Sequence, residues 1–252
     1  MPIALMLFPA TAGLVLGSFL NVVVHRLPRG ESLIAPRSRC PGCATPIKPR
    51  DNVPVLSWFA LRGRCRSCGV PISARYPLVE ALTAALYVAV VLAGGIDGNV
   101  WLGVAFVTML VPVALIDLER RIIPNAILAP AALVAVVLLA VVDPGALPEH
   151  LIAGAAAGSF FLLAALAHPR GMGMGDVKLA AVIGLYLGRV VAPAVFAALV
   201  LGVAVGAVIV YRRGIAGARK TAVPFGPFLA LGGLVAMFVG GPIVDWYLHT
   251  IV

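Results

Sequence analysis

The sequence predicts an all-α polytopic membrane protein with about eight transmembrane helices and a small cysteine-bearing domain after the first. Hydrophobic residues make up 62% of the 252-residue chain, and the mean hydropathy is +1.06. Only 12% of the residues are Asp, Glu, Lys or Arg, against roughly 25% in ordinary soluble domains. Apolar runs of near-spanning length recur along the chain, as in helical membrane proteins.

Eight apolar segments follow one another between charged or Gly- and Pro-bearing connections. The predicted spans are 3–24, 78–96, 100–116, 126–142, 151–168, 177–187, 190–211 and 225–248. The first lacks a basic amino-terminal region and a clear cleavage site, so we expect a retained helix rather than a signal peptide. The sixth is short, which leaves open whether it is tilted, partly re-entrant or begins before Asp176. Small residues at helical spacing, Gly154, Gly158, Gly202 and Gly206, predict helix-packing faces.

Basic residues are concentrated on one side of these spans. Ten of the 19 Lys and Arg residues lie in residues 25–77, and Arg189 alone falls on the opposite side. The others are Arg120, Arg121, Arg170, Lys178, Arg212, Arg213, Arg219 and Lys220. The opposite loops carry Asp97, Asp143 and Glu149. By the positive-inside rule the basic side is cytoplasmic and both termini lie outside. The net charge of +9 therefore reflects topology and contact with anionic lipid rather than nucleic-acid binding.

The long first loop is expected to form a small zinc-ribbon-like domain. We divide the chain into a first helix (1–24), a cytoplasmic cysteine-rich loop domain (25–77) and a membrane domain of about seven helices (78–252). The loop holds all four cysteines, Cys40, Cys43, Cys65 and Cys68, as two CxxC pairs. Two such pairs suit a structural Cys₄ zinc site, which leaves no open position for catalysis. Redox or incidental thiols are the alternatives, while a cytoplasmic location argues against structural disulfides.

Two aspartates occupy positions where membrane-embedded sequence rarely carries charge. Asp117 ends the third span and Asp176 precedes the sixth, so the topology places both at the cytoplasmic face. Ionisable groups at membrane depth are costly and usually functional. Two carboxylates that meet can hydrolyse a peptide bond, one ionised and the other protonated. The structural alternatives are an ion pair of Asp117 with Arg120 or Arg121, and helix capping by Asp176.

Other polar or flexible positions near these spans are weaker candidates. Gly173 and Gly175 belong to a flexible run before Asp176 that permits close backbone approach, and the run lacks the pattern of a phosphate-binding loop. Lys178 is interpreted as an interfacial anchor or a charge facing the substrate. Glu80 is either an ion-pair partner of Arg75 or part of a polar substrate or methyl-donor pocket, and Asn21 is treated in the same way. No histidine receives a role.

Two other classes of protein share some of these features. A secondary transporter can also have about eight spans, glycine breaks and buried acids. It usually shows an internal repeat and a midplane site, whereas here no repeat is evident and both acids lie at one surface. A scaffold anchored by a zinc module would explain the loop but not the two aspartates.

Over nearly its whole length the chain resembles the bacterial type IV prepilin peptidases, which are GxGD-type aspartyl membrane proteases. The stretches that carry this resemblance are 17–23, 39–43, 51–58, 63–68, 73–80, 117–125, 173–178 and 224–229. The resemblance implies that Asp117 and Asp176 are the catalytic pair. The cysteine-bearing loop resembles the bifunctional bacterial form, whereas another GxGD intramembrane protease, the nearest alternative, would not require it.

The resemblance also implies a substrate and a second activity. Members of this family remove the short basic leader of type IV prepilins or of the pseudopilins of type II secretion at the cytoplasmic face of the inner membrane. The bifunctional members then methylate the new amino terminus with S-adenosylmethionine. The sequence contains no Rossmann-type strand–glycine–helix unit for a methyl donor, so methylation follows from the resemblance alone. The particular pilins, the donor-binding residues, the acid and base roles of the aspartates and the oligomeric state stay open.

Overall fold

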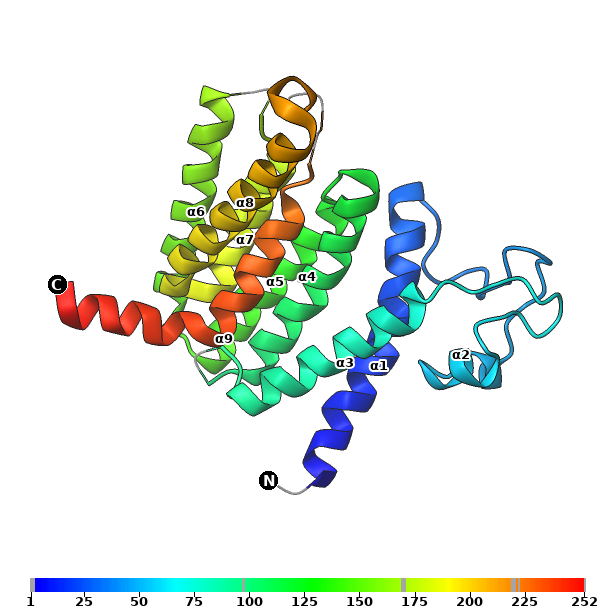
Figure 1. Cartoon of the computed structure of the whole chain (residues 1–252). Coiled ribbons are helices and arrows are strands. Elements are labelled where there is room, and N and C mark those ends of the chain that lie inside the picture. Colours follow the sequence, from blue (N-terminus) through cyan, green and yellow to red (C-terminus); the bar gives the residue numbers. More distant parts are fainter. Residues whose placement is uncertain (1–2, 97, 169–170, 219–220, 222, 252) are drawn as a thin grey trace. The chain divides into compact units, whose positions relative to one another are not determined.

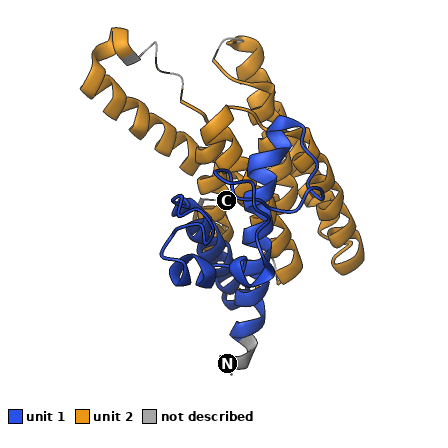
Figure 2. Ribbon diagram, turned by 90° about the vertical axis from the view of Figure 1, so that its right-hand side faces the viewer, with its two compact units in different colours: residues 1–92 blue, residues 93–252 orange. Residues whose placement is uncertain are grey.

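The computed structural model describes residues 3–96, 98–168, 171–218, 221 and 223–251. Four charged residues of the topology argument, Asp97, Arg170, Arg219 and Lys220, lie outside this part of the chain. The described residues form helices and isolated β-bridges but no strand, which confirms the all-α prediction. They divide into two compact units, residues 1–92 and 93–252, coloured separately in Figure 2.

Unit 1 contains the first membrane helix, the cysteine loop and the second membrane helix. Its elements are α1 (Ile3–Arg26), η1 (Leu27–Arg29), η2 (Pro49–Asp51), α2 (Leu56–Ala60) and α3 (Arg75–Ala93). α1 approaches α3 through Gly13 and Gly17, where added Cβ atoms would lie 2.5 Å from Ala84 Cα and 2.8 Å from Glu80 Cα. Such small residues let two helices pack backbone to backbone.

Unit 2 is a helical bundle (Figure 1). Its helices are α4 (Val100–Arg120), α5 (Asn125–Val142), α6 (Leu147–Ala167), α7 (Met174–Leu187), α8 (Val191–Ala218) and α9 (Gly226–Ile251), with η3 (Gly188–Val190) between α7 and α8. α7 packs against α4, α5, α6, α8 and α9. Its residues from Val177 to Leu187 are almost all buried, as expected of a helix that is apolar all round and enclosed by others.

Each predicted span lies mostly on a helix. Among the described residues, seven helices are long and apolar enough to cross a membrane, against the about eight predicted. The difference arises at α7 and α8, which count as one apolar stretch from Met174 to Gly217. α7 has 14 residues, and at about 1.5 Å per residue it is too short to cross a bilayer core alone. It begins at Met174, so Asp176 lies inside its first turn.

The predicted glycine packing faces are confirmed at three of four positions. Added Cβ atoms would lie 2.9 Å from Ala181 O at Gly154 and 2.9 Å from Ala181 Cβ at Gly158, so both glycines of α6 face α7. An added Cβ at Gly202 would lie 3.2 Å from the Phe225 ring. The prediction is wrong for Gly206, where an added Cβ would meet no atom of the described residues within 4 Å. Spacing alone does not tell which helical turns have a neighbour.

Candidate active site

Asp117 lies in the last turn of α4 and is 5% exposed. Its Oδ2 accepts a hydrogen bond of 3.0 Å from the backbone N–H of Gly226, the first residue of α9. α4 ends because Arg121 adopts a left-handed conformation, with its N–H bonded to Asp117 O. Within the described residues, Asp117 forms no ion pair with Arg120 or Arg121. The ion-pair alternative is therefore wrong, and the carboxylate points into the bundle.

Asp176 is half-buried at the third position of α7. The alternative interpretation expected Asp176 to be the N-cap residue, but that position is taken by Gly173. Asp176 Oδ2 instead accepts a 3.3 Å hydrogen bond from the Gly173 N–H, as the third helical residue does in a capping box. A capping bond engages only one oxygen and leaves the other available. Asp176 also interacts electrostatically with Asp117. The fold thus brings together two carboxylates from α4 and α7 that are separated by 59 positions in the sequence.

The segments that carry the two aspartates are fastened to each other. A Cβ at Gly175 would lie 3.0 Å from Ile123 Cβ, so only a small residue fits at this position beside the α4–α5 connection. Two residues after Asp176, Lys178 Nζ donates a 3.1 Å hydrogen bond to Asn125 Oδ1 at the start of α5. Gly175 and Lys178 therefore hold the turn before α7 against the residues that follow Asp117. This role of Lys178 is more specific than the predicted interfacial anchor.

Glu80 and Asn21 act as ties within unit 1. The Glu80 carboxylate, 7% exposed, accepts a 2.7 Å hydrogen bond from the Val55 N–H. It thereby holds a residue with the unusual φ of 61°. Asn21 Nδ2 donates to Gly17 O and, at 3.2 Å, to Tyr76 O, which joins α1 to the start of α3.

The four cysteine sulfurs form one cluster in unit 1. All four Sγ atoms lie within 4.8 Å of one another, and those of Cys40 and Cys68 are 3.7 Å apart. A tetrahedral zinc site with Zn–S bonds of about 2.3 Å has sulfurs about 3.8 Å apart. Hydrogen bonding to Thr45 lowers the pKa of the Cys43 thiol to about 6, whereas burial and the neighbouring thiols raise the pKa of Cys68. The cluster therefore fits the predicted zinc site.

The two CxxC segments adopt the same turn. Cys40 N donates to Thr45 O and Ala44 N to Cys40 O, while Cys65 N donates to Val70 O and Gly69 N to Cys65 O. Each turn is closed by a single β-bridge, from Arg39 to Pro46 and from Arg64 to Pro71. Each turn offers two thiols to the same point, which is how paired knuckles enclose a metal.

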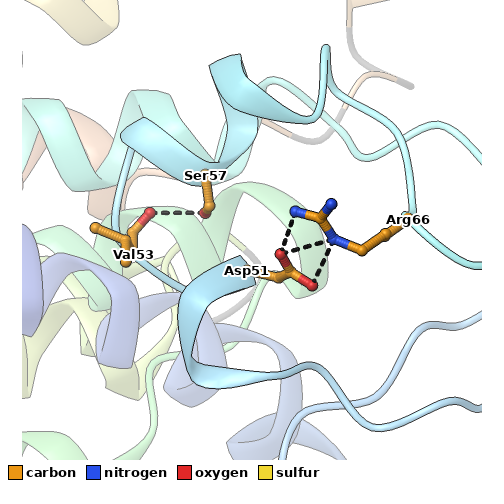
Figure 3. A network of polar contacts seen from close by, with 4 residues as sticks. All are labelled: Asp51, Val53, Ser57 and Arg66. Atoms are coloured by element: carbon orange, nitrogen blue, oxygen red, sulfur yellow. Dashed lines mark hydrogen bonds and ion pairs between the residues drawn. The ribbon is translucent and has the colours of Figure 1, made fainter.

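An ion pair ties the second knuckle to the rest of the loop. Figure 3 shows Arg66 against Asp51, with Nη2 at 2.7 Å from Oδ1 and Nε at 3.0 Å from both carboxylate oxygens. These bonds and the positive charge of Arg66 hold the pKa of Asp51 below its ordinary value. The same view shows Ser57 Oγ donating to Val53 O.

Cys40→Ser is expected to remove most of the bound zinc and to make residues 25–77 sensitive to protease, because zinc binding supplies folding free energy to such small modules. The measurement is elemental analysis of protein purified without chelator, followed by limited proteolysis. Ser57→Ala, which removes one hydrogen bond in the same loop, is the control and should keep one zinc per chain. Wild-type protein without metal would contradict the assignment.

Comparison with known proteins follows the same division of the chain. A family model described as the bacterial peptidase A24 N-terminal domain matches residues 11–93, which include all four cysteines. A second, described as the type IV leader peptidase family, matches residues 104–210, which include Asp117 and Asp176. No solved structure matches the chain significantly.

Several curated relatives carry the name prepilin leader peptidase/N-methyltransferase. The relative from Bacillus subtilis is 38% identical over 94% of this chain and 95% of its own length. The relative from Aeromonas salmonicida is 36% identical over 94% of this chain and 92% of its own length. The relative from Myxococcus xanthus is 39% identical over 82% of this chain and 64% of its own length. These relatives and the two family models span both the cysteine cluster and the paired carboxylates, and the chain belongs to the type IV leader peptidase family.

Proposed function

We propose that this protein removes the leader peptide of type IV prepilins or pseudopilins and then methylates the new amino terminus. The observation that carries the proposal is the pair of carboxylates that α4 and α7 bring together in unit 2. The names of the relatives support both activities. The candidate spanning helices and these relatives mark a multi-pass inner-membrane protein. We place the active site at its cytoplasmic face because of the basic residues there.

In the proposed reaction one aspartate is ionised and accepts a proton from a water molecule held between the pair. The water oxygen attacks the scissile carbonyl carbon, and the protonated aspartate donates its proton to the carbonyl oxygen. Collapse breaks the carbon–nitrogen bond, and the departing amine takes up the proton that the first aspartate had accepted. The second aspartate takes a proton back from a hydroxyl group of the intermediate as the new carboxyl group forms, so the pair returns to its starting state. Lys178 and Gly175 keep the two carboxylates at a fixed position relative to each other, because they contact the segment that follows Asp117.

We assign a zinc ion to the four cysteines and S-adenosylmethionine to the methyl transfer. Zinc would be held by four thiolates from the paired knuckles and would stabilise the loop, with no open position for chemistry. S-adenosylmethionine would supply an electrophilic methyl group to the new amino terminus. Since the described residues contain no strand, a Rossmann-type donor site is not expected among them.

The test is a purified-enzyme assay with a prepilin of known sequence. We expect loss of the leader mass, followed by a gain of one methyl group only when S-adenosylmethionine is added. An uncleaved prepilin in detergent and in lipid would contradict the peptidase proposal. Cleavage without methylation would restrict the proposal to the peptidase and favour the GxGD protease alternative.

A further inference from the structure

We propose that the backbone amide of Gly226 is a positioning group of the active site that fixes the Asp117 carboxylate for its reaction with water. Residues 224–229, one of the stretches noted in the sequence analysis, have no role in the chemistry described above. The 3.0 Å hydrogen bond from Gly226 N to Asp117 Oδ2 is buried and joins residues 109 positions apart. The inference rests on the proposed catalytic role of Asp117.

The contact requires glycine. An added Cβ at position 226 would lie 2.6 Å from Asp117 Oδ2 and 3.1 Å from its Cγ. Real Cβ atoms essentially never approach other atoms within 3.0 Å, so any other residue must move the carboxylate or the start of α9. Such a shift matters for chemistry, because a misplacement of about 1 Å can lower a rate by about 10²-fold.

The neighbours of Gly226 hold its amide in place. The Phe225 ring packs between the rings of Phe161 and Phe228, with centroids 5.9 Å and 6.1 Å away. Phe161 in α6 is fully buried, so this anchor is part of the core of unit 2. Pro227 is the second residue of α9, where the missing N–H of proline costs no helical hydrogen bond. In this motif Phe225 packs in the core, Gly226 donates the hydrogen bond to Asp117, and Pro227 lies in the first turn of α9.

The contact also makes the two oxygens of Asp117 unequal. Oδ2 is engaged by Gly226, which leaves Oδ1 for the water and for Asp176. The amino terminus of the 26-residue helix α9 carries a partial positive charge that stabilises a carboxylate. Asp176 has a longer bond of 3.3 Å from Gly173 in its own turn. Gly226 therefore fixes one oxygen of Asp117 and leaves the other free for the reaction.

Gly226→Ala tests the positioning role, with Gly241→Ala as its matched control. Both glycines belong to α9, but in the part of the chain that the structure describes an added Cβ at Gly241 would meet no atom within 4 Å. We expect Gly226→Ala to lower kcat for leader cleavage by about 10²-fold or more, with KM within about threefold. Gly241→Ala should change neither value by more than about twofold. A folded Gly226→Ala enzyme with normal kcat would overturn the proposal.

A spectroscopic measurement tests the contact without altering Gly226. Phe225-Gly226 is the only Phe-Gly pair in the sequence, so labelling phenylalanine with ¹³C at the carbonyl and glycine with ¹⁵N isolates the Gly226 amide signal. We expect this proton to move upfield in Asp117→Asn, because a neutral oxygen accepts a weaker hydrogen bond than a carboxylate does, and to move less in Asp176→Asn.

The two measurements separate failure of the inference from failure of the proposed function. A Gly226 amide signal that stays in place in an inactive Asp117→Asn enzyme would overturn the inference while leaving the catalytic pair intact. A signal that moves in an Asp117→Asn enzyme that still cleaves prepilin would overturn the proposed function and, with it, the positioning role. If Gly226→Ala does not fold, the amide signal alone decides whether the contact exists.

Discussion

Replacing either Asp117 or Asp176 with asparagine is expected to lower the rate of leader cleavage by about 10³-fold or more, because general acid and base groups each contribute about 10² to 10⁴-fold. Asparagine keeps the size of aspartate but can neither accept the proton of the water nor give one to the carbonyl oxygen. The loss should appear in kcat rather than in KM, since neither change removes the surface that holds the leader. The rate is measured with purified protein and a full-length prepilin.

Asp143→Asn is the control for this pair. Asp143 is an exposed residue of the α5–α6 connection, where its carboxylate accepts a hydrogen bond from Ala146 N. Its replacement should leave the cleavage rate within about twofold, because surface changes away from special sites shift stability by only about 0.5 kcal/mol. Both catalytic-site variants should insert into the membrane and elute as wild type does. Wild-type cleavage activity in either Asp117→Asn or Asp176→Asn would contradict the aspartyl mechanism.

The pairing of Asp117 with Asp176 could be predicted from the sequence because two independent signals agreed. The apolar segments placed each aspartate at a span end, and the distribution of Lys and Arg placed both ends on one side of the membrane. The cysteine cluster could be predicted for a similar reason, since the CxxC spacing dictates where the thiols lie. The described cluster of four sulfurs agrees with that expectation.

Other contacts could not be predicted because they depend on packing between distant segments. The Gly226 amide carries no side-chain signal, and its partner Asp117 lies 109 residues away. Lys178 and Glu80 were assigned from their charge, whereas their contacts are with Asn125 Oδ1 and the Val55 N–H. The count of spans also depended on structure, because α7 has only 14 residues and counts together with α8 as one candidate span.

The two proposed activities have different chemical needs, and this difference leads to a second large expected effect. Peptide hydrolysis needs both carboxylates, since one must accept a proton while the other donates one. Methyl transfer needs a deprotonated amine aligned with an electrophilic methyl group, for which proximity and orientation supply most of the rate. Two of the stretches that carry the family resemblance, 17–23 with Asn21 and 73–80 with Glu80, belong to unit 1. Asp117 and Asp176 belong to unit 2.

The Asp176→Asn enzyme is therefore expected to methylate a synthetic pre-cleaved pilin that begins with phenylalanine, although it does not cleave full prepilin. Its methylation rate should lie within about threefold of the wild-type rate. The reason is that the amide oxygen of asparagine can still accept the hydrogen bond from Gly173, so the turn before α7 keeps its shape. The measurement is transfer of a labelled methyl group from S-adenosylmethionine, with full prepilin as the parallel substrate. If the folded variant fails where wild type succeeds, the two sites share Asp176. If wild type also fails, the chain is a peptidase alone, and the cysteine loop serves to hold unit 1 together rather than to support a second reaction.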